Sequence, residues 1–340
     1  MTVRVGINGF GRIGRSFLRA VVDRPTDIEV VALNDITSPE TNAQLLRYDS
    51  TQGRFPGSVD VSDGSLVVQG QRIAVFAERD PSSLPWKDVG AEVVVEASGR
   101  FTSRAAAAGH LEGGAKRVVV TAPSGDADAT FVVGVNDGDF DPEHHVVVSN
   151  ASCTTNCFVP MVKVLDDAFG ILSGLMTTVH AYTNDQNLLD VAHRDLRRAR
   201  AAAINIVPTS TGAARSTGLV LEAMKGRLDG QSLRVPVPVG SITDFTAVVN
   251  ATPSVDEVNT AFASAARTPP LKGIVAYSED PLVSSDIVGN PASCVFDSGL
   301  TMVQSLDDAR ALVKVEGWYD NEWGFSNRLV DLVCIVGAAR

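Results

Sequence analysis

Three glycines near the start of the chain constrain its fold more than any other feature. Gly9, Gly11 and Gly14 follow an apolar segment, Val3 to Ile7, and precede a segment with apolar residues at helical spacing. A glycine-rich turn between a strand and a helix lets the backbone approach a phosphate closely, and the helix N-terminus favours an anion. We therefore expect the first strand, turn and helix of a dinucleotide-binding fold.

An acidic residue lies at the distance that such a fold requires. Asp35 follows a second apolar segment, Ile28 to Leu33, and comes about 20 residues after Gly14. A carboxylate at the end of this strand binds a ribose 2′-hydroxyl and repels a 2′-phosphate. The pattern predicts a cofactor of the NAD type rather than NADP. The alternative is an ordinary glycine-rich turn with an unrelated acid.

Apolar segments alternate with helical ones over the first part of the chain. They recur at Val93 to Glu96, Arg117 to Val120, Phe131 to Val135 and Val146 to Val148. This pattern is typical of a doubly wound (Rossmann) parallel sheet covered on both faces. Later segments, such as Ile171 to Tyr182, are longer and alternate polar with apolar residues, which favours a mostly antiparallel sheet. We expect an α/β chain with a Rossmann domain and a second α+β domain.

The composition excludes several classes of protein. The chain has 340 residues and a formal net charge of −11, which argues against a general nucleic-acid binder. No apolar run is long enough to span a bilayer, and the N-terminus lacks the apolar core of a signal peptide. The four cysteines form neither a disulfide framework nor a C-x-x-C zinc pair. We expect a reduced, cytoplasmic protein without a metal, a membrane or a nucleic-acid partner.

A cysteine at a helix start is the leading candidate for chemistry. The segment Asn150 to Cys157 leads from an apolar strand into a helix and places Cys153 in its first turn. Backbone N–H groups and the helix dipole favour an anion there. We expect the thiol to lose its proton more easily than a free thiol and to act as a nucleophile. The alternative, a structural cysteine, would suit an apolar helix middle better; Cys157 is expected to be such a packing residue.

An activated thiol needs a nearby base, and His180 is the candidate. It lies in the segment Leu175 to Tyr182, where alternation puts it on one face with Met176 and Thr178. A histidine so placed is more often a satisfied core residue, and the cysteine signal is what favours a catalytic role. The other histidines, His110 among them, have polar neighbours in the sequence and are predicted to lie at the surface.

Hydroxyl-bearing and basic residues form candidate anion sites. Thr183 follows the strand of His180, and Pro208 to Ala213 is a hydroxyl-rich turn that opens a helix, as in many phosphate sites. Arg234 lies in an otherwise apolar strand and must find an anion or a carboxylate there. The basic segment His193 to Arg200 suggests a small anionic ligand. The alternatives are N-capping threonines, and a solvated helix face or a subunit-contact ion-pair cluster for the arginines.

With these residues in place, the chain resembles the phosphorylating glyceraldehyde-3-phosphate dehydrogenases over essentially its full length. Five motifs in order carry the resemblance: Val5 to Arg15, Ala151 to Cys157, Thr178 to Thr183, Asp195 to Arg200 and Trp318 to Trp323. The resemblance implies an enzyme that converts glyceraldehyde 3-phosphate, inorganic phosphate and NAD into 1,3-bisphosphoglycerate and NADH, in glycolysis or gluconeogenesis.

The resemblance also implies a role for each candidate residue. Cys153 would form a hemithioacetal and then a thioester, with His180 as base, and phosphate would cleave the thioester. The substrate's own phosphate is assigned to Thr183 and Arg234. The attacking phosphate is assigned to Ser152, Thr154, Arg198, Thr211 and Gly212. The cofactor is assigned to Gly9, Gly11, Arg12, Ile13, Gly14, Asp35, Arg79, Ser98, Thr121 and Asn321.

A division of the chain and an assembly follow from the same resemblance. Residues 1–151 and 318–340 are expected to form the NAD-binding domain, and residues 152–317 the catalytic domain. The family folds its C-terminal helix back onto the nucleotide domain. The loop from about Tyr182 to Ala203 is expected to complete the cofactor pocket of a neighbouring subunit in a homotetramer.

Two positions depart from the family pattern. Asp190 is followed by Val191 and Ala192, where NAD-specific members usually have Leu-Pro. The smaller residues leave room near the adenosine ribose and resemble members that also accept NADP, so we expect NAD first with some use of NADP. Phe325 stands where many members have tyrosine, and we expect little effect from it.

Two other functions fit part of the pattern. Erythrose-4-phosphate dehydrogenase, the sister enzyme, hydrolyses its thioester with water; it lacks the threonine found here as Thr183 and alters the hydroxyl-rich helix start. Thr183 and Thr209 to Gly212 therefore favour the phosphate-dependent reaction. A non-catalytic nucleotide-binding or adhesion protein with this fold would need neither Cys153 nor His180.

Overall fold

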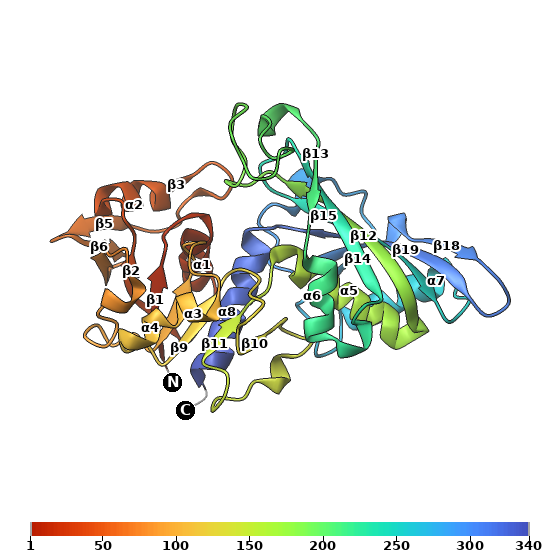
Figure 1. Ribbon diagram of the computed structural model, residues 1–340, viewed down its shortest axis with the longest axis horizontal. Coiled ribbons are helices and arrows are strands. Elements are labelled where there is room, and N and C mark those ends of the chain that lie inside the picture. Colours follow the sequence, from red (N-terminus) through yellow and green to blue (C-terminus); the bar gives the residue numbers. More distant parts are fainter. Residues whose placement is uncertain (1, 339–340) are drawn as a thin grey trace. The chain divides into compact units, whose positions relative to one another are not determined.

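The computed structural model describes residues 2–338, and the chain divides into two compact units. The first takes in the described residues of Met1–Phe131, Asp137–Ser152 and Ser326–Arg340, and the second takes in Val132–Asn136 and Cys153–Phe325. Figure 1 labels their helices and strands. Residues 318–325, which the resemblance assigns to the first domain, fall within the second unit.

The first unit is built around a sheet of nine strands, most of them parallel. In spatial order they are β10 (Ala129–Thr130), β11 (Val147–Ser149), β9 (Arg117–Val120), β8 (Val93–Glu96), β1 (Val3–Asn8), β2 (Ile28–Asn34), β7 (Gln71–Phe76), β6 (Ser65–Val68) and β5 (Val59–Ser62). The pairs from β10 to β7 are parallel, whereas β6 and β5 are joined by antiparallel pairs. The predicted Rossmann parallel sheet is confirmed.

One predicted strand is wrong. The sequence predicts a strand over residues 131–135, but the structure has a loop and a turn there, directly after the short strand β10. Phe131 and Val132 are nevertheless buried. The apolar character of this segment therefore reflects a buried loop rather than strand pairing.

Helices of the first unit surround the glycine turn and the sheet. They are α1 (Arg12–Asp23), α2 (Pro39–Arg47), α3 (Arg104–Ala107), α4 (Gly109–Glu112) and most of α8 (Trp323–Ala338), with 3₁₀ turns at Pro81–Ser83 and Asp137–Asp139 and a small hairpin of β3 (Tyr48–Asp49) and β4 (Gly53–Arg54). Gly11 is the N-cap of α1, so the helix begins directly at the glycine turn. α8 buries an apolar stripe that includes Leu329, Leu332 and Val336.

The second unit contains a mixed sheet that is mostly antiparallel, as predicted. In spatial order its strands are β13 (Val207–Ser210), β14 (Leu228–Val235), β12 (Ile171–Ala181), β15 (Ser241–Val249), β19 (Ala311–Tyr319), β17 (Cys294–Asp297) and β16 (Val275–Ser278), and β18 (Met302–Ser305) pairs with β19. β12 is parallel to β14 and antiparallel to β15. Burial alternates along β15 and β19 because one face of the sheet is covered.

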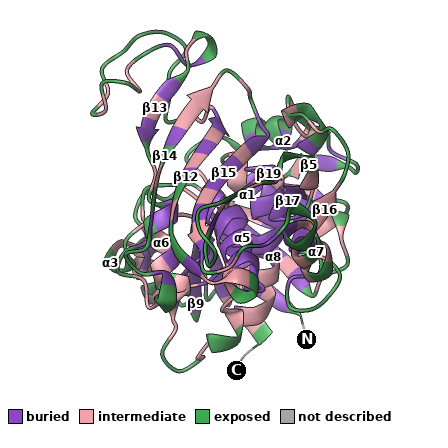
Figure 2. Ribbon diagram, turned by 90° about the vertical axis from the view of Figure 1, so that its right-hand side faces the viewer, coloured by how far each residue is buried: buried purple, intermediate pink, exposed green. Residues whose placement is uncertain are grey.

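Helix α5 (Cys153–Phe169) covers the buried face of this sheet, and most of its residues are buried (Figure 2). The ring of Phe158 on α5 meets that of Phe245 on β15 edge to face, with centroids 4.8 Å apart. The other helices of the unit are α6 (Ala213–Val220) and α7 (Val255–Ala265), with 3₁₀ turns at Ala202–Ile204, Glu222–Met224, Ser284–Ile287 and Ser298–Leu300. α5 thus begins at Cys153, as the sequence predicts within one residue.

Candidate active site

The structure brings the predicted nucleophile and base together. Cys153 is the first residue of α5, and His180 is the last residue but one of β12. The Cys153 sulfur lies 3.4 Å from Nε2 of His180, which is hydrogen-bonding distance for sulfur. Ala151 makes the preceding turn sharp, with a φ of +56° that is uncommon for a residue other than glycine. The strand, turn and helix together aim the thiol at the ring.

The thiol is not ionised by the helix start alone, which corrects the prediction of an easily lost proton. Burial raises the pKa of the Cys153 thiol, although the charge of Arg234 and the N–H of Thr154 act to lower it. Burial, together with the nearby Arg234 charge, lowers the pKa of His180 to about 3. Burial therefore disfavours a charge on either group alone. The thiolate forms by transfer of the sulfur's proton to Nε2, which keeps the two charges together.

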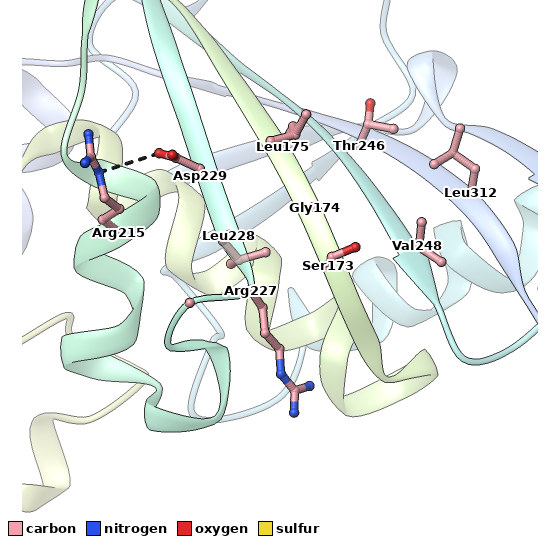
Figure 3. Close-up of a pocket in the computed structure, with 11 residues that line it drawn as sticks. Ser173, Gly174, Leu175, Arg215, Arg227, Leu228, Asp229, Thr246, Val248 and Leu312 are labelled. Atoms are coloured by element: carbon pink, nitrogen blue, oxygen red, sulfur yellow. Dashed lines mark ion pairs between the residues drawn. The ribbon is translucent and has the colours of Figure 1, made fainter.

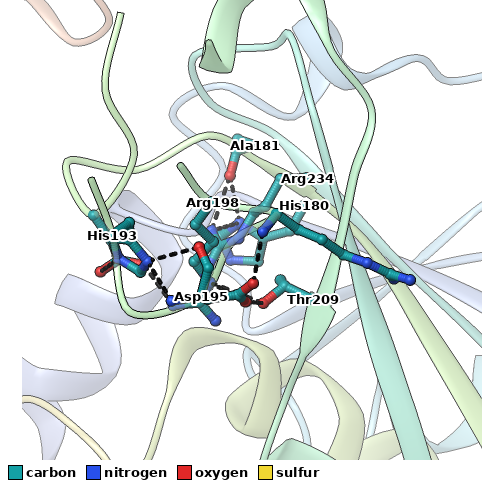
Figure 4. Close-up of polar contacts among 9 residues, drawn as sticks. His180, Ala181, His193, Asp195, Arg198, Thr209 and Arg234 are labelled. Atoms are coloured by element: carbon teal, nitrogen blue, oxygen red, sulfur yellow. Dashed lines mark hydrogen bonds and ion pairs between the residues drawn. The ribbon is translucent and has the colours of Figure 1, made fainter. Parts of the chain in front are cut away.

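Arg234 lies on the other side of the histidine ring. Residues His180 and Arg234 are direct neighbours in the parallel pairing of β12 with β14. Nη1 of Arg234 is 2.8 Å from Nδ1 of His180 and 3.0 Å from the carbonyl oxygen of Ala181, and Nδ1 is itself 2.7 Å from that oxygen (Figure 4). The predicted anion-binding arginine is thus part of the same cluster as the base.

A second arginine is held by carboxylates and a hydroxyl. Arg198 lies 2.5 Å from the carboxylate of Asp185 and donates through Nε to the Thr209 hydroxyl at 2.8 Å. That hydroxyl donates in turn to Asp195 at 2.9 Å (Figure 4). Burial would raise the pKa of Asp185, but the Arg198 guanidinium lowers it below its ordinary value. Arg198 is therefore held in place by its acidic neighbours. An incoming anion would have to replace part of their contacts with the guanidinium.

The remaining predicted substrate residues lie at or near the starts of α5 and α6 and the end of β12. Thr154 is buried, and its hydroxyl lies 2.9 Å from that of Tyr319. Thr211 accepts a hydrogen bond from the N–H of Ala213 at 3.2 Å, but Gly212 is the N-cap of α6 and no side chain caps this helix, so the N-capping alternative does not describe Thr211. Thr183 follows β12 and is half-buried, and Ser152 directly precedes α5.

Sequence reasoning misses the role of Tyr319. Its hydroxyl lies 2.9 Å from that of Thr154 and 2.8 Å from that of Thr178, and burial raises the pKa of the phenol. The tyrosine thereby links α5 to β12 beneath the thiol. The only signal in the sequence is its place inside the motif from Trp318 to Trp323, where its partners cannot be read.

Five of the predicted cofactor residues of the first unit meet at one cavity of about 500 Å³. Its wall includes Gly9, Gly11, Asp35, Arg79 and Ser98, together with Asn8, Asn34, Ile36, Glu78, Ala97, Arg100 and Phe101. A dinucleotide fits these residues, because the glycine turn, the start of α1 and an acid come together there.

Two of the three glycines in the turn leave no space for a larger residue. A Cβ on Gly9 would lie 2.5 Å from the backbone of Ser98, and one on Gly14 would lie 2.2 Å from the carbonyl oxygen of Gly9. A Cβ on Gly11 would meet nothing within 4 Å, so this glycine leaves open space beside the helix start. Asp35 accepts a hydrogen bond from the N–H of Phe10 at 2.8 Å and thereby closes the turn.

Five predicted cofactor residues do not line this cavity. Arg12 forms an ion pair with Asp49, and Ile13 lies beside it in the first turn of α1. The Thr121 hydroxyl donates to the carbonyl oxygen of Glu96 at 3.0 Å. Asn321 belongs to the second unit, where its side-chain oxygen accepts from Gly240 and Ser241 at 3.2 and 3.1 Å. Gly14, the last of the three glycines, supports the turn from within α1.

His110 is wrongly predicted to lie at the surface. It is fully buried: its Nδ1 accepts from the indole N–H of Trp86 at 3.0 Å, so its Nε2 donates to Glu96 at 2.9 Å. Glu96 also accepts from the amide of Asn8 at 2.5 Å and from the N–H and hydroxyl of Ser98 at 2.8 and 2.5 Å. This buried carboxylate therefore fixes Asn8 and Ser98 on the cavity wall. Its partners lie up to 88 residues away in the sequence, so no local sequence pattern reveals the network.

The described residues lack two features of other classes of protein. None of the helices between residues 2 and 338 combines the length and the apolar character needed to cross a membrane. In the same part of the chain, no group of three or more His, Cys, Asp and Glu side chains is arranged to hold a metal ion. The cytoplasmic location stays a prediction.

Comparison with known proteins gives matches over nearly the whole chain. The NAD-binding domain of glyceraldehyde 3-phosphate dehydrogenase matches residues 3–104, and its C-terminal domain matches residues 152–321. Glyceraldehyde-3-phosphate dehydrogenase 2 of Streptomyces arenae is 57% identical over 339 residues, with 100% of both chains covered. The glyceraldehyde-3-phosphate dehydrogenases of Streptomyces coelicolor and Mycobacterium tuberculosis are 56% and 57% identical, with 99% of each chain covered.

The histidine's role as proton acceptor can be tested by alkylation of the thiol. We expect His180→Asn to slow the reaction of Cys153 with iodoacetamide about a hundredfold at pH 7. In the variant the thiolate forms only by proton loss to solvent, so its rate should rise about tenfold per pH unit. The wild-type rate should change less with pH, because transfer inside the pair releases no proton. Mass spectrometry of the labelled peptide gives both rates.

Matched controls are available in the same chain. His144→Asn removes an exposed imidazole that contacts Asp141 and should leave the rate unchanged. Cys157 and Cys294 are fully buried and should be labelled far more slowly than Cys153 in every variant. Equal rates and equal pH dependence in the wild type and His180→Asn would contradict the assignment.

Proposed function

The chain belongs to the glyceraldehyde-3-phosphate dehydrogenase family, and from this premise we propose how its residues carry out the reaction. The protein is an NAD-dependent oxidoreductase of glyceraldehyde 3-phosphate. The proposal depends on one observation, the 3.4 Å contact between the Cys153 sulfur and Nε2 of His180. A protein that only bound nucleotides or adhered to a partner would need no such pair.

We assign the oxidation steps to this pair. The thiol passes its proton to Nε2, the sulfur attacks the aldehyde carbon, and the proton moves to the aldehyde oxygen to give a hemithioacetal. His180 then takes the hydroxyl proton as a hydride leaves the same carbon, and a thioester remains on Cys153. NAD, when bound, supplies the acceptor for this hydride. An oxygen of inorganic phosphate attacks the thioester carbon, the sulfur leaves, and 1,3-bisphosphoglycerate is released.

Two arginines support separate roles for two anions. Arg234 contacts the base and, with Thr183, would bind the substrate's own phosphate. The attacking phosphate is assigned to Arg198 and to the residues around two helix starts, Ser152, Thr154, Thr211 and Gly212. Guanidinium groups bind phosphate through paired hydrogen bonds, and the first turns of α5 and α6 favour an anion. Arg198 must first give up part of its contact with Asp185.

Phosphate dependence separates this reaction from that of erythrose-4-phosphate dehydrogenase. With glyceraldehyde 3-phosphate and NAD, we expect continuous NADH formation only when phosphate is present, because the thioester has no other efficient acceptor. Without phosphate, absorbance at 340 nm should show about one NADH per site and then stop. Full multiple-turnover NADH formation in the absence of phosphate and arsenate would refute the assignment.

We also propose that the protein uses NADP as a secondary cofactor. Asp35, which repels a 2′-phosphate, lines the cofactor cavity and favours NAD. Val191 and Ala192 are smaller than the Leu-Pro of NAD-specific members, and Val191 is half exposed. Asp35 thus disfavours a phosphate on the ribose 2′-oxygen, whereas the small side chains of Val191 and Ala192 leave room for one.

The cofactor preference follows from a direct comparison of kcat/KM. We expect the value for NAD to exceed that for NADP, with measurable turnover on NADP. Replacing Val191 and Ala192 together by Leu and Pro should lower kcat/KM for NADP several-fold and leave that for NAD nearly unchanged. A wild-type preference for NADP, or no measurable turnover with it, would overturn the proposal.

A homotetramer is our proposal for the assembly. The loop after β12 exposes large apolar side chains, with Leu188, Leu189 and Leu196 between 78% and 82% exposed. The outer face of the sheet also carries Leu175, 70% exposed, beside a shallow cavity of about 530 Å³ whose wall includes Arg215 and Asp229 (Figure 3). Several large exposed apolar side chains on one loop favour a protein–protein contact there.

Light scattering after gel filtration tests the assembly. We expect a mass four times the 35.8 kDa of one chain. Leu188→Asp with Leu196→Asp should reduce the mass and weaken NAD binding, because the loop is expected to complete a neighbour's cofactor pocket. Leu306→Asp, a half-exposed position on a different turn, is the control and should keep the full mass. A monomeric wild type at assay concentrations would contradict the proposal.

A further inference from the structure

Glu96 lies behind the wall of the cofactor cavity and accepts hydrogen bonds from four donors. Its Oε1 accepts from the N–H and the hydroxyl of Ser98 at 2.8 and 2.5 Å. Its Oε2 accepts from the amide of Asn8 at 2.5 Å and from Nε2 of His110 at 2.9 Å. Asn8 and Ser98 line the cavity, whereas only 2% of Glu96 is exposed. The carboxylate therefore acts on a ligand of this cavity through its neighbours.

The direction of the Asn8 amide is fixed from its far side. Asn34 binds the backbone of Glu78 in one orientation: its Oδ1 accepts from the N–H at 2.7 Å, and its Nδ2 donates to the carbonyl oxygen at 2.9 Å. The same Nδ2 donates to Oδ1 of Asn8 at 2.7 Å. Because the donor of an amide lies opposite its acceptor, Nδ2 of Asn8 then points at Glu96. Backbone groups thus determine that a donor faces the carboxylate.

The ring of His110 is fixed by an independent group. The indole N–H of Trp86 can only donate, and it lies 3.0 Å from Nδ1 of His110. Nδ1 therefore accepts, and the ring carries its proton on Nε2, which faces Glu96. A doubly protonated ring would turn a second donor toward the indole. Trp86 and His110 are both fully buried, so this donor faces the carboxylate without help from a ligand.

These neighbours determine which chemical group can occupy position 96. All four hydrogen-bonding neighbours of the side chain are donors. A protonated acid would turn its O–H toward a donor, and a glutamine would turn an N–H toward one. Only an ionised carboxylate accepts from all four. Since a buried polar group without a partner is costly, an amide at this position would force its neighbours to reorient.

The carboxylate also determines what Ser98 offers to a ligand. The hydroxyl donates its proton to Glu96 at 2.5 Å, and its oxygen accepts from the N–H of Arg100 at 3.2 Å. One lone pair is left, so toward the cavity this hydroxyl can only accept. Its matching partner on a dinucleotide is therefore a hydroxyl or an amino group rather than a phosphate oxygen.

We propose that Glu96 is a positioning residue for the dinucleotide: its charge holds Asn8 and Ser98 in the orientation in which they meet the cofactor. Glu96, Asn8 and Asn34 are in register across the adjacent strands β8, β1 and β2. They form a row at the carboxyl ends of parallel strands, the edge at which such sheets bind their ligands. A rotated Asn8 amide would also lose its bond to Asn34. The inference rests on the proposed function only in taking NAD as the ligand of this cavity.

The order of two substitutions tests the need for a charge. Glu96→Gln keeps the size of the side chain and loses the charge, whereas Glu96→Asp keeps the charge and is one methylene shorter. We expect the Gln variant to raise the Kd for NAD about tenfold and the Asp variant to raise it less. Calorimetry on the nucleotide-free, full-length protein measures both. A side chain that only filled space would give the opposite order, and that order, or an unchanged Kd in Glu96→Gln, would overturn the proposal.

Ser98→Ala keeps the proposal open to test if position 96 tolerates no change. It removes the hydroxyl that Glu96 holds and leaves the carboxylate and its other partners in place. We expect the Kd for NAD to rise several-fold, because the cofactor loses the acceptor that faces it. An unchanged Kd would show that the held hydroxyl does not meet the ligand and would contradict the positioning role.

Measurements outside the cavity separate positioning from general damage. Cys153 belongs to the second unit, so its alkylation rate without NAD should stay close to that of the wild type in each variant. A rate that falls as much as NAD binding weakens would contradict a specific role. Glu92→Gln is the matched control, since it removes a surface partner of Lys116 from the same segment and should leave the Kd unchanged. A wild type that does not bind NAD refutes the proposed function itself, whereas unchanged binding in Glu96→Gln refutes only this inference.

Discussion

The distance between the Cys153 sulfur and the His180 ring is set by how closely α5 packs on its sheet. On β19, a Cβ at Gly317 would lie 2.5 Å from the sulfur of Met161 on the helix and 2.6 Å from that of Cys294, so a larger residue there would require these side chains to move. The edge-to-face contact of Phe158 with Phe245 fixes the helix along the sheet. Since α5 begins at Cys153, this packing determines where the sulfur lies. The chemistry of the site therefore depends on a close helix–sheet contact in the core.

That packing also explains why the two groups act as a pair. A half-buried thiol and a buried imidazole each resist a charge on their own, because the surrounding protein solvates ions poorly. Moving one proton between two atoms that lie 3.4 Å apart creates a negative and a positive charge side by side, where each stabilises the other. Tyr319 and the threonines below the thiol supply hydroxyl dipoles in the same volume. The reactive state is thus a property of the cluster rather than of either residue.

The sequence predicts the elements well where one local pattern decides them. The strands Val93–Glu96 and Arg117–Val120 occur as predicted, because a short apolar run in an alternating α/β chain is usually buried as a strand of the parallel sheet. The same reasoning fails for residues 131–135, where burial of a loop produces the same pattern. The Cys153–His180 pairing was predicted from chemistry. The burial of His110 and the contacts of Tyr319 were not, because they depend on partners far away in the sequence.

Glu96 has a consequence for how the cofactor cavity meets its ligand. One buried carboxylate already binds Asn8, Ser98 and His110, so this wall has its shape before any ligand arrives. A wall that is ordered in advance loses little conformational entropy on association, and more of the contact energy goes into affinity. The same rigidity limits tolerance, since a ligand of different outline finds Asn8 and Ser98 already held by Glu96. Selectivity on this side of the cavity is therefore set when the chain folds.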